Sequence, residues 1–432
     1  MLRVECWVFR TSGPVEAYFF YVMDDIVITG IGIISACGIG REAFWQNCLR
    51  GSTGIAPIQS FDTSAYRSHL GAEARDFNPK DFMPPLKYRR LSRVSRLAVA
   101  ASIEALKDSA LIVTPQSAPS IGVIIGTGYG STSQTDDFFL GMLKEGPEGA
   151  NPSLFPDTVP NAPASQVSIF HGIKGPNTTI SHNDVSGEQA MACASLLLRE
   201  GRAEALLVGS VDEMSAVLFH SYATVRALSP KGAYKEGLRP FDRRRNGRVL
   251  GEGAGTLVLE KKNRARERGA KIYGSLVACS GTGAPVGTAR YEAGAEQMAR
   301  AMKSVLRAAG ISPSQVDYIS AAANSTQELD RAEALAIRQV FSQTQSIPIS
   351  SLQGNIGDFC GSGALRAAAL LLSMRDGKIL PTLGLKDPEF DLDHIMGQPR
   401  AKQIQYALLN GFSFGGSNVC LLFKKEIQMG LG

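Results

Sequence analysis

The chain has 432 residues, of which 44% are hydrophobic and 20% are charged, and its 45 glycines are spread along the whole length. This length exceeds that of an ordinary domain and the composition excludes fibrous and disordered proteins, so we expect two domains or one large duplicated fold. The 45 basic side chains exceed the 40 acidic ones by only five, and this dispersed excess gives no reason to expect nucleic-acid binding.

The first core strand is expected to begin near Met23, in "MDDIVITGIGIISACG", so residues 1–23 are interpreted as an N-terminal extension. Its apolar run "AYFFYV" is too short to cross a bilayer. The preceding residues carry acids where a secretory signal would not. We expect a soluble, cytoplasmic protein without a membrane span.

Short β-branched runs that end in glycine or polar turns alternate with amphipathic stretches along the rest of the chain. The runs include "DDIVITGIGIIS", "SIGVIIGTGYG", "EALLVGSVDEM" and "VDYISAAAN". Ala, Leu and Met recur at helical spacing over 94–109, 186–201, 293–310, 329–341 and 362–374. The alternation predicts an α/β protein with buried parallel strands covered by helices. A charged segment over 261–271 is expected to join two halves, 24–270 and 271–426.

The glycine and cysteine patterns do not indicate a cofactor or a metal. "GIGIISACGIG" follows a strand but lacks the spacing of a dinucleotide fingerprint, and no phosphate-binding GxxxxGK[ST] motif occurs. The seven cysteines are odd in number, widely spaced and without metal-ligand spacing. Reduced thiols are the simplest interpretation, and we expect neither a cofactor nor a metal site.

Four blocks carry a resemblance to a known family: "DDIVITGIGIISACGIG", "GPNTTISHNDVSG", "RPFDRRRNGRVLGEGAGTLVLEKKNRARERGAKIYG" and "NGFSFGGSNVCLLFKK". Together they closely resemble the elongating β-ketoacyl-acyl carrier protein synthases, over residues 24–425. The resemblance implies the thiolase fold, in which two βαβαβαββ halves stack as an αβαβα layered sandwich.

In that family a cysteine at a helix N-terminus, two histidines and a lysine carry out the condensation. A helix N-terminus favours the thiolate, and backbone N–H groups hold the thioester oxygen. The family's "TAC.SG", "NAHGTST" and "KSMTGH" fall on "HNDVSG", "SAAANST" and "SSLQGN", so all four catalytic positions are changed, to Asp184, Ala322, Ser350 and Asn355. No shift of register supplies two histidines, since His occurs only at 69, 171, 182, 220 and 394.

Three residues near the nucleophile position have both a structural and a chemical interpretation. Asp184 is a poor thioester acceptor but a good N-cap for the helix that follows, so we predict a capping role. His182 lies two residues away, and a His–carboxylate pair remains an alternative, although such neighbours need not face one pocket. Cys360 lies close to the matched second-histidine loop and is interpreted as a small buried side chain.

The resemblance also implies surfaces for an acyl chain and for a carrier protein. Phe414 matches the family's gating phenylalanine. The segment that crosses the family's dimer interface and borders the acyl tunnel falls on Tyr129, Thr132, Thr135, Phe138, Phe139 and Met142. The basic run in "LKYRRLSRVSR" falls where the family docks an acidic carrier protein, with Lys87, Arg89, Arg90, Arg93 and Arg96. The family's second docking pair, Arg-Lys, is replaced by Glu148 and Gly149.

A catalytically degenerate chain of this kind resembles a chain length factor. Such a subunit pairs with an active, Cys-containing ketosynthase and shapes its tunnel in type II polyketide, polyene or fatty-acid-like biosynthesis. The implied partners are that ketosynthase, as a heterodimer, and an acyl carrier protein, directly or through the partner. Two alternatives stay open: an independent acyltransferase or hydrolase, and a homodimeric acyl-binding scaffold.

Overall fold

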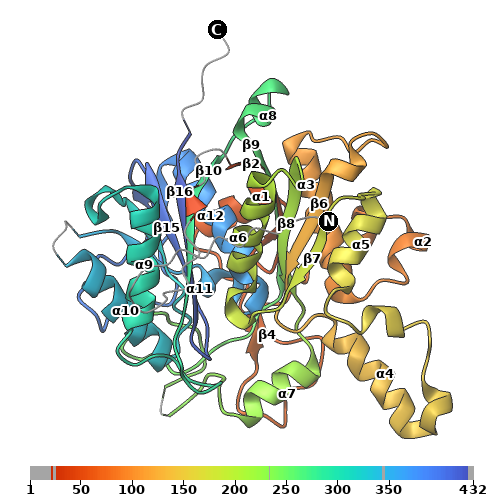
Figure 1. The fold of residues 1–432 in the computed structure, drawn as a ribbon. Helices are drawn as coiled ribbons and strands as arrows, with labels where there is room; N and C mark the ends of the chain where they lie inside the picture. The colour runs from red at the N-terminus through yellow and green to blue at the C-terminus, as the bar shows by residue number, and fades with distance from the viewer. Residues whose placement is uncertain (1–20, 23–25, 233, 343–345, 427–432) are drawn as a thin grey trace.

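The strands of the two halves follow one another in the same spatial order. The computed structural model describes residues 21–22, 26–232, 234–342 and 346–426 (Figure 1). The first half runs β7-β6-β8-β9-β2 and the second runs β12-β11-β15-β16-β10. In each half the first three strands named are parallel, and the last two join antiparallel. This repetition confirms the duplicated α/β architecture.

The strands of the first half are β2 (Ile26–Ser35), β6 (Ile121–Gly126), β7 (Asn177–Ile180), β8 (Ala205–Asp212) and β9 (Gly253–Lys261). Those of the second half are β10 (Gly274–Gly283), β11 (Tyr318–Ser320), β12 (Ile349–Ser350), β15 (Tyr406–Phe412) and β16 (Ser417–Lys424). The halves meet where Ile28 and Val27 of β2 pair with Gly274 and Ser275 of β10. Short β3 (Gly38–Ile39), β4 (Ala56–Pro57), β5 (Leu70–Gly71), β13 (Lys378–Ile379) and β14 (Arg400–Ala401) lie outside this order.

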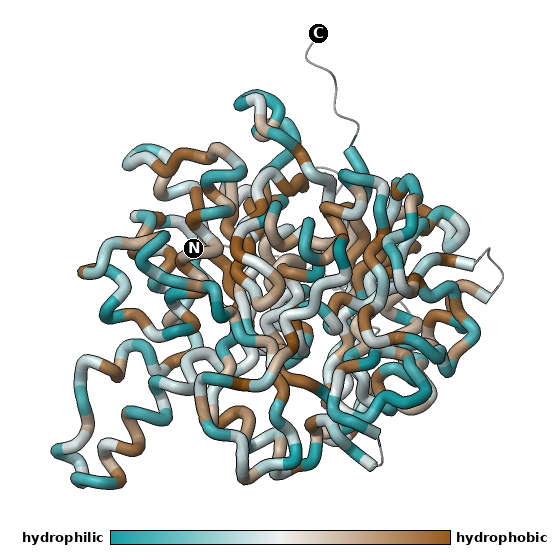
Figure 2. The backbone as a smooth tube through the Cα atoms, turned by 180° about the vertical axis from the view of Figure 1, so that it is seen from behind, coloured by the Kyte–Doolittle hydropathy of each residue, from teal (hydrophilic) through white to brown (hydrophobic). Residues whose placement is uncertain are grey.

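Helices form the remaining layers, and three apolar clusters fill the spaces between them. α3 (Arg93–Ser109) and α5 (Ala162–His171) cover one outer face, and α9 (Glu296–Ala309) and α10 (Gln327–Phe341) cover the other (Figure 1). α6 (Ser186–Arg199) and α12 (Gly363–Asp376) share the central cluster. Figure 2 shows the hydrophobic segments concentrated in the interior of the chain.

The predicted helices are confirmed, and their ends differ from the predicted ones by at most three residues. Burial on both sides explains α12, whose residues from Gly363 to Met374 are all buried: a helix between two sheets has no solvent face and is apolar all round. The remaining helices are α1 (Arg41–Leu49), α2 (Pro85–Tyr88), α4 (Thr132–Glu145), α7 (Ala216–Thr224), α8 (Lys262–Glu267) and α11 (Gln353–Ile356).

Two segments stand apart from the layered core. α4 projects from the body and has no buried residue (Figure 1). Before β2, Tyr21 and Val22 form β1, which pairs with Cys279 and Ala278 of β10, while the rest of the predicted extension, 1–20 and 23, lies outside the described residues. Within the described ranges, no helix is both long and apolar enough to cross a membrane.

Candidate functional site

The two central helices begin at the same place in the molecule. A 3-10 turn, Asn183–Val185, leads into α6, and a second one, Cys360–Ser362, leads into α12. Gly187 and Gly363 allow this approach, since a Cβ added to Gly187 would lie 2.8 Å from the Cα of Gly363. Asp184 and Cys360 are brought together as a result, and the thiol donates a 3.4 Å hydrogen bond to Asp184 Oδ1.

The predicted capping role of Asp184 is wrong. Val185 occupies the N-cap position of α6, and no side chain caps that helix. Both carboxylate oxygens of Asp184 instead accept hydrogen bonds from the guanidinium of Arg248, each at 3.2 Å. A parallel two-bond pair of this kind is among the strong charge-assisted contacts in proteins.

Arg248 is the centre of this cluster, although no motif or spacing in the sequence pointed to it. Its side chain is only 5% exposed and contacts a second carboxylate, that of Asp358, at 3.2 Å. It also donates to the Tyr291 hydroxyl at 2.6 Å. Burial by itself disfavours the cation, but the nearby Asp184, Tyr291 and Asp358 raise the pKa of Arg248 well above its ordinary value. The guanidinium is a permanent charge in the middle of the site.

Asp358 ties the second half into the cluster. Its carboxylate also accepts hydrogen bonds from the side-chain amides of Asn324 at 3.1 Å and Gln353 at 3.3 Å. Burial raises its pKa to about 6, although Arg248 opposes the shift. The cluster therefore holds two acids around one cation.

The other predicted catalytic positions make their described contacts elsewhere. The Ser350 hydroxyl shares a 2.8 Å hydrogen bond with the hydroxyl of Tyr318. The Asn355 amide donates to the Ser52 carbonyl at 2.8 Å. Ala322 offers a buried methyl group, and its backbone N–H donates to Glu333 at 3.0 Å. Of the four positions, Asp184 is the one whose described contacts reach Arg248.

Neither His182 nor Cys360 has the surroundings of a catalytic group. The His182 ring is exposed and shares a 2.7 Å hydrogen bond with the Ser417 hydroxyl, so it is directed to another partner than Asp184. Cys360 is 2% exposed. Burial, and then the carboxylates of Asp184 and Asp212, raise the pKa of its thiol well above the ordinary value. The reactive thiolate is thereby disfavoured.

Aromatic rings enclose the cluster. The guanidinium carbon of Arg248 lies 5.4 Å from the ring centre of Phe414 and 5.7 Å from that of Tyr222. The Tyr222 hydroxyl in turn lies 2.9 Å from that of Tyr129. Phe414 and Tyr129 thus belong to the surroundings of Arg248 and its partner Asp184.

The other predicted tunnel residues follow α4 away from the cluster. Thr132 shares a 2.8 Å hydrogen bond with the Ser215 hydroxyl, and Thr135 donates to the carbonyl of Thr158 at 3.2 Å. The rings of Phe138 and Phe155 are 5.8 Å apart. Phe139 is 54% exposed, and Met142 is partly buried. These residues lie along the projecting helix α4, and their role in lining a tunnel stays a prediction.

The side chains of the basic run differ in their contacts. Arg93 forms a two-bond ion pair with Glu252, a residue only 1% exposed, so its charge is compensated within the chain. Arg96 donates to the carbonyl of Tyr88 at 3.0 Å. Lys87 lies 4.8 Å from the ring centre of Phe170, while Arg89 and Arg90 are exposed. The role of this basic run as a docking surface stays a prediction.

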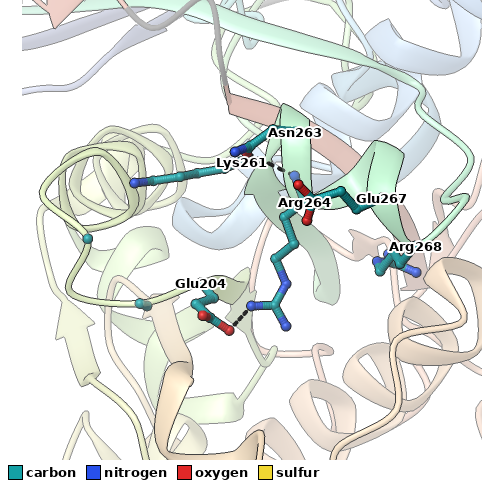
Figure 3. A pocket seen from close by; sticks show the side chains of 8 residues that line it. Glu204, Lys261, Asn263, Arg264, Glu267 and Arg268 are labelled. Carbon is teal, nitrogen blue, oxygen red and sulfur yellow. Dashed lines mark hydrogen bonds and ion pairs between the residues drawn. The ribbon is translucent and has the colours of Figure 1, made fainter.

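A surface hollow at α8 is separate from the cluster. It is lined by charged side chains that include Glu204, Lys261 and Arg264 (Figure 3). Arg264 forms an ion pair with Glu204, and Arg268 forms one with the buried Glu260. The paired charges leave this hollow without an evident ligand.

Comparison with known proteins places the whole arrangement in a family. Residues 23–265 match the β-ketoacyl synthase N-terminal domain, and residues 270–386 match the C-terminal domain. The chain belongs to the β-ketoacyl synthase family. It is 36% identical to 3-oxoacyl-[acyl-carrier-protein] synthase 2 of Synechocystis sp. over 93% of this chain and 98% of that one. The corresponding Staphylococcus aureus protein is 34% identical, with the same coverage of both chains.

Solved structures show the same ketosynthase fold. A β-ketoacyl synthase from Burkholderia phymatum has a TM-score of 0.85 at 30% identity, covering 94% of this chain and 100% of its own. The ishigamide ketosynthase/chain length factor has a TM-score of 0.86 at 26% identity, with the same coverage. The thiolase-like fold predicted from the sequence is confirmed.

Proposed function

We propose that this β-ketoacyl synthase homologue is a non-catalytic subunit that acts as a chain length factor. The observation that carries the proposal is the bidentate ion pair between Asp184 and Arg248, at the position where the family's nucleophile stands. A carboxylate held in this way cannot accept an acyl group as a thiolate does. The similarity to a ketosynthase/chain length factor structure supports the assignment.

The loop before α12 supports the same conclusion when the family's motif is aligned with it in a different register. Moving the family's "KSMTGH" three residues along places it on "QGNIGD", with Gly357 and Asp358 on its Gly-His. Asp358 contacts Arg248, whereas the described contacts of Asn355 lie elsewhere. We therefore propose Gln353 at the lysine position and Asp358 at the second histidine. In either register the condensing groups are missing.

The role left to such a chain is to assemble with an active ketosynthase and to bound its acyl tunnel. α4 supports this role, because Phe139 and Leu143 are 54% and 81% exposed on a helix without a buried residue. Large exposed apolar side chains of this kind mark protein–protein contacts. We propose a heterodimer in the cytoplasm, with the residues of 129–142 facing the partner's tunnel and an acyl carrier protein docking on the complex.

The two other candidate functions are weaker on specific grounds. An independent acyltransferase or hydrolase would need Cys360, His182 or Asp184 as its reactive group, and the contacts of all three oppose that use. A homodimeric scaffold would use the same exposed face of α4, so it is an outcome of the test.

The test is co-expression with an active, Cys-containing ketosynthase from the same organism. We expect a stable heterodimer, product formation by the pair, and no acyl adduct on this chain in intact-protein mass spectrometry with acyl carrier protein thioesters. In the same pair Thr135→Phe should shorten the product, because it fills tunnel volume and leaves the partner's chemistry alone. Ser314→Phe, on the exposed surface of the second half, is the control. A homodimer that ignores the ketosynthase would contradict the proposal, and so would an unchanged product distribution.

A further inference from the structure

Arg248 joins three separate parts of the chain at one point. One terminal nitrogen lies 3.2 Å from both Asp184 Oδ1 and Asp358 Oδ2, so it connects the start of α6 to the loop before α12. The other nitrogen binds Asp184 Oδ2 at 3.2 Å and the Tyr291 hydroxyl at 2.6 Å. Phe414, between β15 and β16, stacks near the guanidinium at 5.4 Å.

We propose that Arg248 is a latch that closes this chain's own acyl chamber, holding Phe414 over the vestigial nucleophile position. The space around Asp184 is shut as well as lacking catalytic groups. If the chain pairs with a ketosynthase as proposed above, an acyl chain in the complex then occupies only the partner's chamber. Arg248 is thereby a residue that determines which of the two chambers is used.

The energetic reason lies in the burial of the charges. Arg248 and Asp358 are 5% and 4% exposed at the side chain, and Asp184 is 11% exposed. Separating a buried ion pair costs more than its formation contributes, since each charge loses its partner without regaining water. An apolar acyl chain offers no compensating group to any member of the cluster. Its entry would therefore carry the full free-energy cost of separating the ion pairs.

The loop that carries Phe414 turns at two glycines. Gly415 and Gly416 have φ values of 82° and 86°, in the left-handed region that glycine adopts without strain. The Phe414 ring is only partly buried, in contrast to Phe412, which is 1% exposed. The stacking on Arg248 therefore decides where this ring lies, as a cation over an aromatic face contributes most where water is excluded.

Cys360 is a native reporter for opening of the chamber, because its thiol lies 3.4 Å from Asp184 and is 2% exposed. The test compares iodoacetamide labelling of Cys360, followed by peptide mass spectrometry, in the wild-type full chain and in Arg248→Met. We expect labelling of Cys360 to be faster by about ten-fold or more in the variant, through local opening of the loop. Cys420, which is fully buried outside this cluster, is the internal control.

The direction of the change in labelling rate distinguishes greater access to Cys360 from a change in the acidity of its thiol. Arg248 lowers the pKa of the Cys360 thiol, so removing the cation makes the thiolate scarcer and slows alkylation if access is unchanged. Faster labelling of Cys360 with unchanged Cys420 supports the latch, and equal or slower labelling overturns it.

If Arg248→Met destabilises the whole fold, Cys420 will also react faster and the first comparison is lost. A second variant, Phe414→Ala, is then used. Phe414→Ala keeps every hydrogen bond of the cluster and removes only the ring over it. Faster labelling of Cys360 in this variant supports the latch, and an unchanged rate overturns it. Neither measurement uses a partner or a carrier protein, so failure of the latch is distinguishable from failure of the chain length factor assignment.

Discussion

At the scale of single residues, the charge of Asp184 is compensated by contacts made far along the chain. A carboxylate buried at the centre of a fold loses its hydration, and this costs several kcal/mol unless a cation and donors replace the water. Arg248 supplies two hydrogen bonds, and the Tyr291 hydroxyl lies 3.5 Å from Asp184 Oδ2. Asp184 and Arg248 therefore form one buried, charge-compensated unit.

Asp184→Asn is expected to lower the free energy of unfolding by about 1–3 kcal/mol, because an amide leaves one nitrogen of the buried Arg248 without its acceptor. The measurement is urea denaturation. Asp387→Asn is the matched control, since its ion pair with Arg243 is 56% and 60% exposed and is worth less than about 1 kcal/mol. Equal losses in the two variants would contradict the buried pair at Asp184.

His171 provides a prediction of pH dependence. Burial, and then the nearby Lys87, lower the pKa of its ring from 6.5 to about 4. The unfolded chain therefore binds the proton more tightly, and stability that is present above pH 6.5 is lost as the pH falls toward 4. The loss at His171 should be on the order of 1–3 kcal/mol, and His171→Gln should show less of it in unfolding curves from neutral to acidic pH. An unchanged profile would mean that other groups dominate.

At the scale of elements, α4 differs from every helix of the layered core. α6 and α12 derive their stability from burial between two sheets, whereas α4 leaves Phe139, Leu140 and Leu143 at the surface. An isolated amphipathic helix of 14 residues is marginal in water without tertiary contacts. In the proposed heterodimer the partner subunit would cover this apolar face.

Leu143→Asp should weaken the proposed heterodimer without unfolding this chain. Leu143 is 81% exposed, so the change should alter the free energy of unfolding by less than about 0.5 kcal/mol, whereas a charge in an apolar contact costs several times more. Size-exclusion chromatography with the ketosynthase measures the effect. Ile112→Asp, at a residue 76% exposed after α3, is the control. If both variants assemble equally well, α4 lies outside the interface.

At the scale of the whole molecule, a second buried ion pair holds the central helices together. Glu188 of α6 and Arg366 of α12 are 2.8 Å apart and almost fully buried. Arg366 also donates to the carbonyl of Asn410 in β15 at 2.5 Å. One side chain therefore links both central helices and the second sheet.

Arg366→Ala is expected to destabilise the fold by about 3–5 kcal/mol, because Glu188 is left buried and unpaired. Burial already raises the pKa of Glu188, so part of the loss is relieved when that carboxyl takes up a proton at lower pH. Arg375→Ala, whose pairs are partly exposed, should cost less than about 1 kcal/mol. Thermal unfolding of both variants checks the difference, and equal midpoints would contradict the role of Arg366.

The sequence by itself determined the family and the duplicated fold. Those features are carried by short continuous blocks and by helical periodicity, and the ends of α3, α6 and α12 were predicted to within two residues. The boundary between the halves near residue 270 and the tunnel role of residues 129–142 stay predictions. Each of the features confirmed depends on residues that are close neighbours along the chain.

Only the tertiary structure decided what Asp184 does. Its partner Arg248 lies 64 positions away, and Cys360 lies 176 positions away, and no local pattern connects them. Capping was the wrong prediction because capping preference is a local property, and a buried cation attracts a carboxylate more strongly than backbone N–H groups do. The same reasoning applies to Arg93, which was expected at a docking surface and is paired with Glu252, 159 positions away. Charge on a helix face is visible in a sequence, whereas its compensation depends on which distant strands the fold brings beside it.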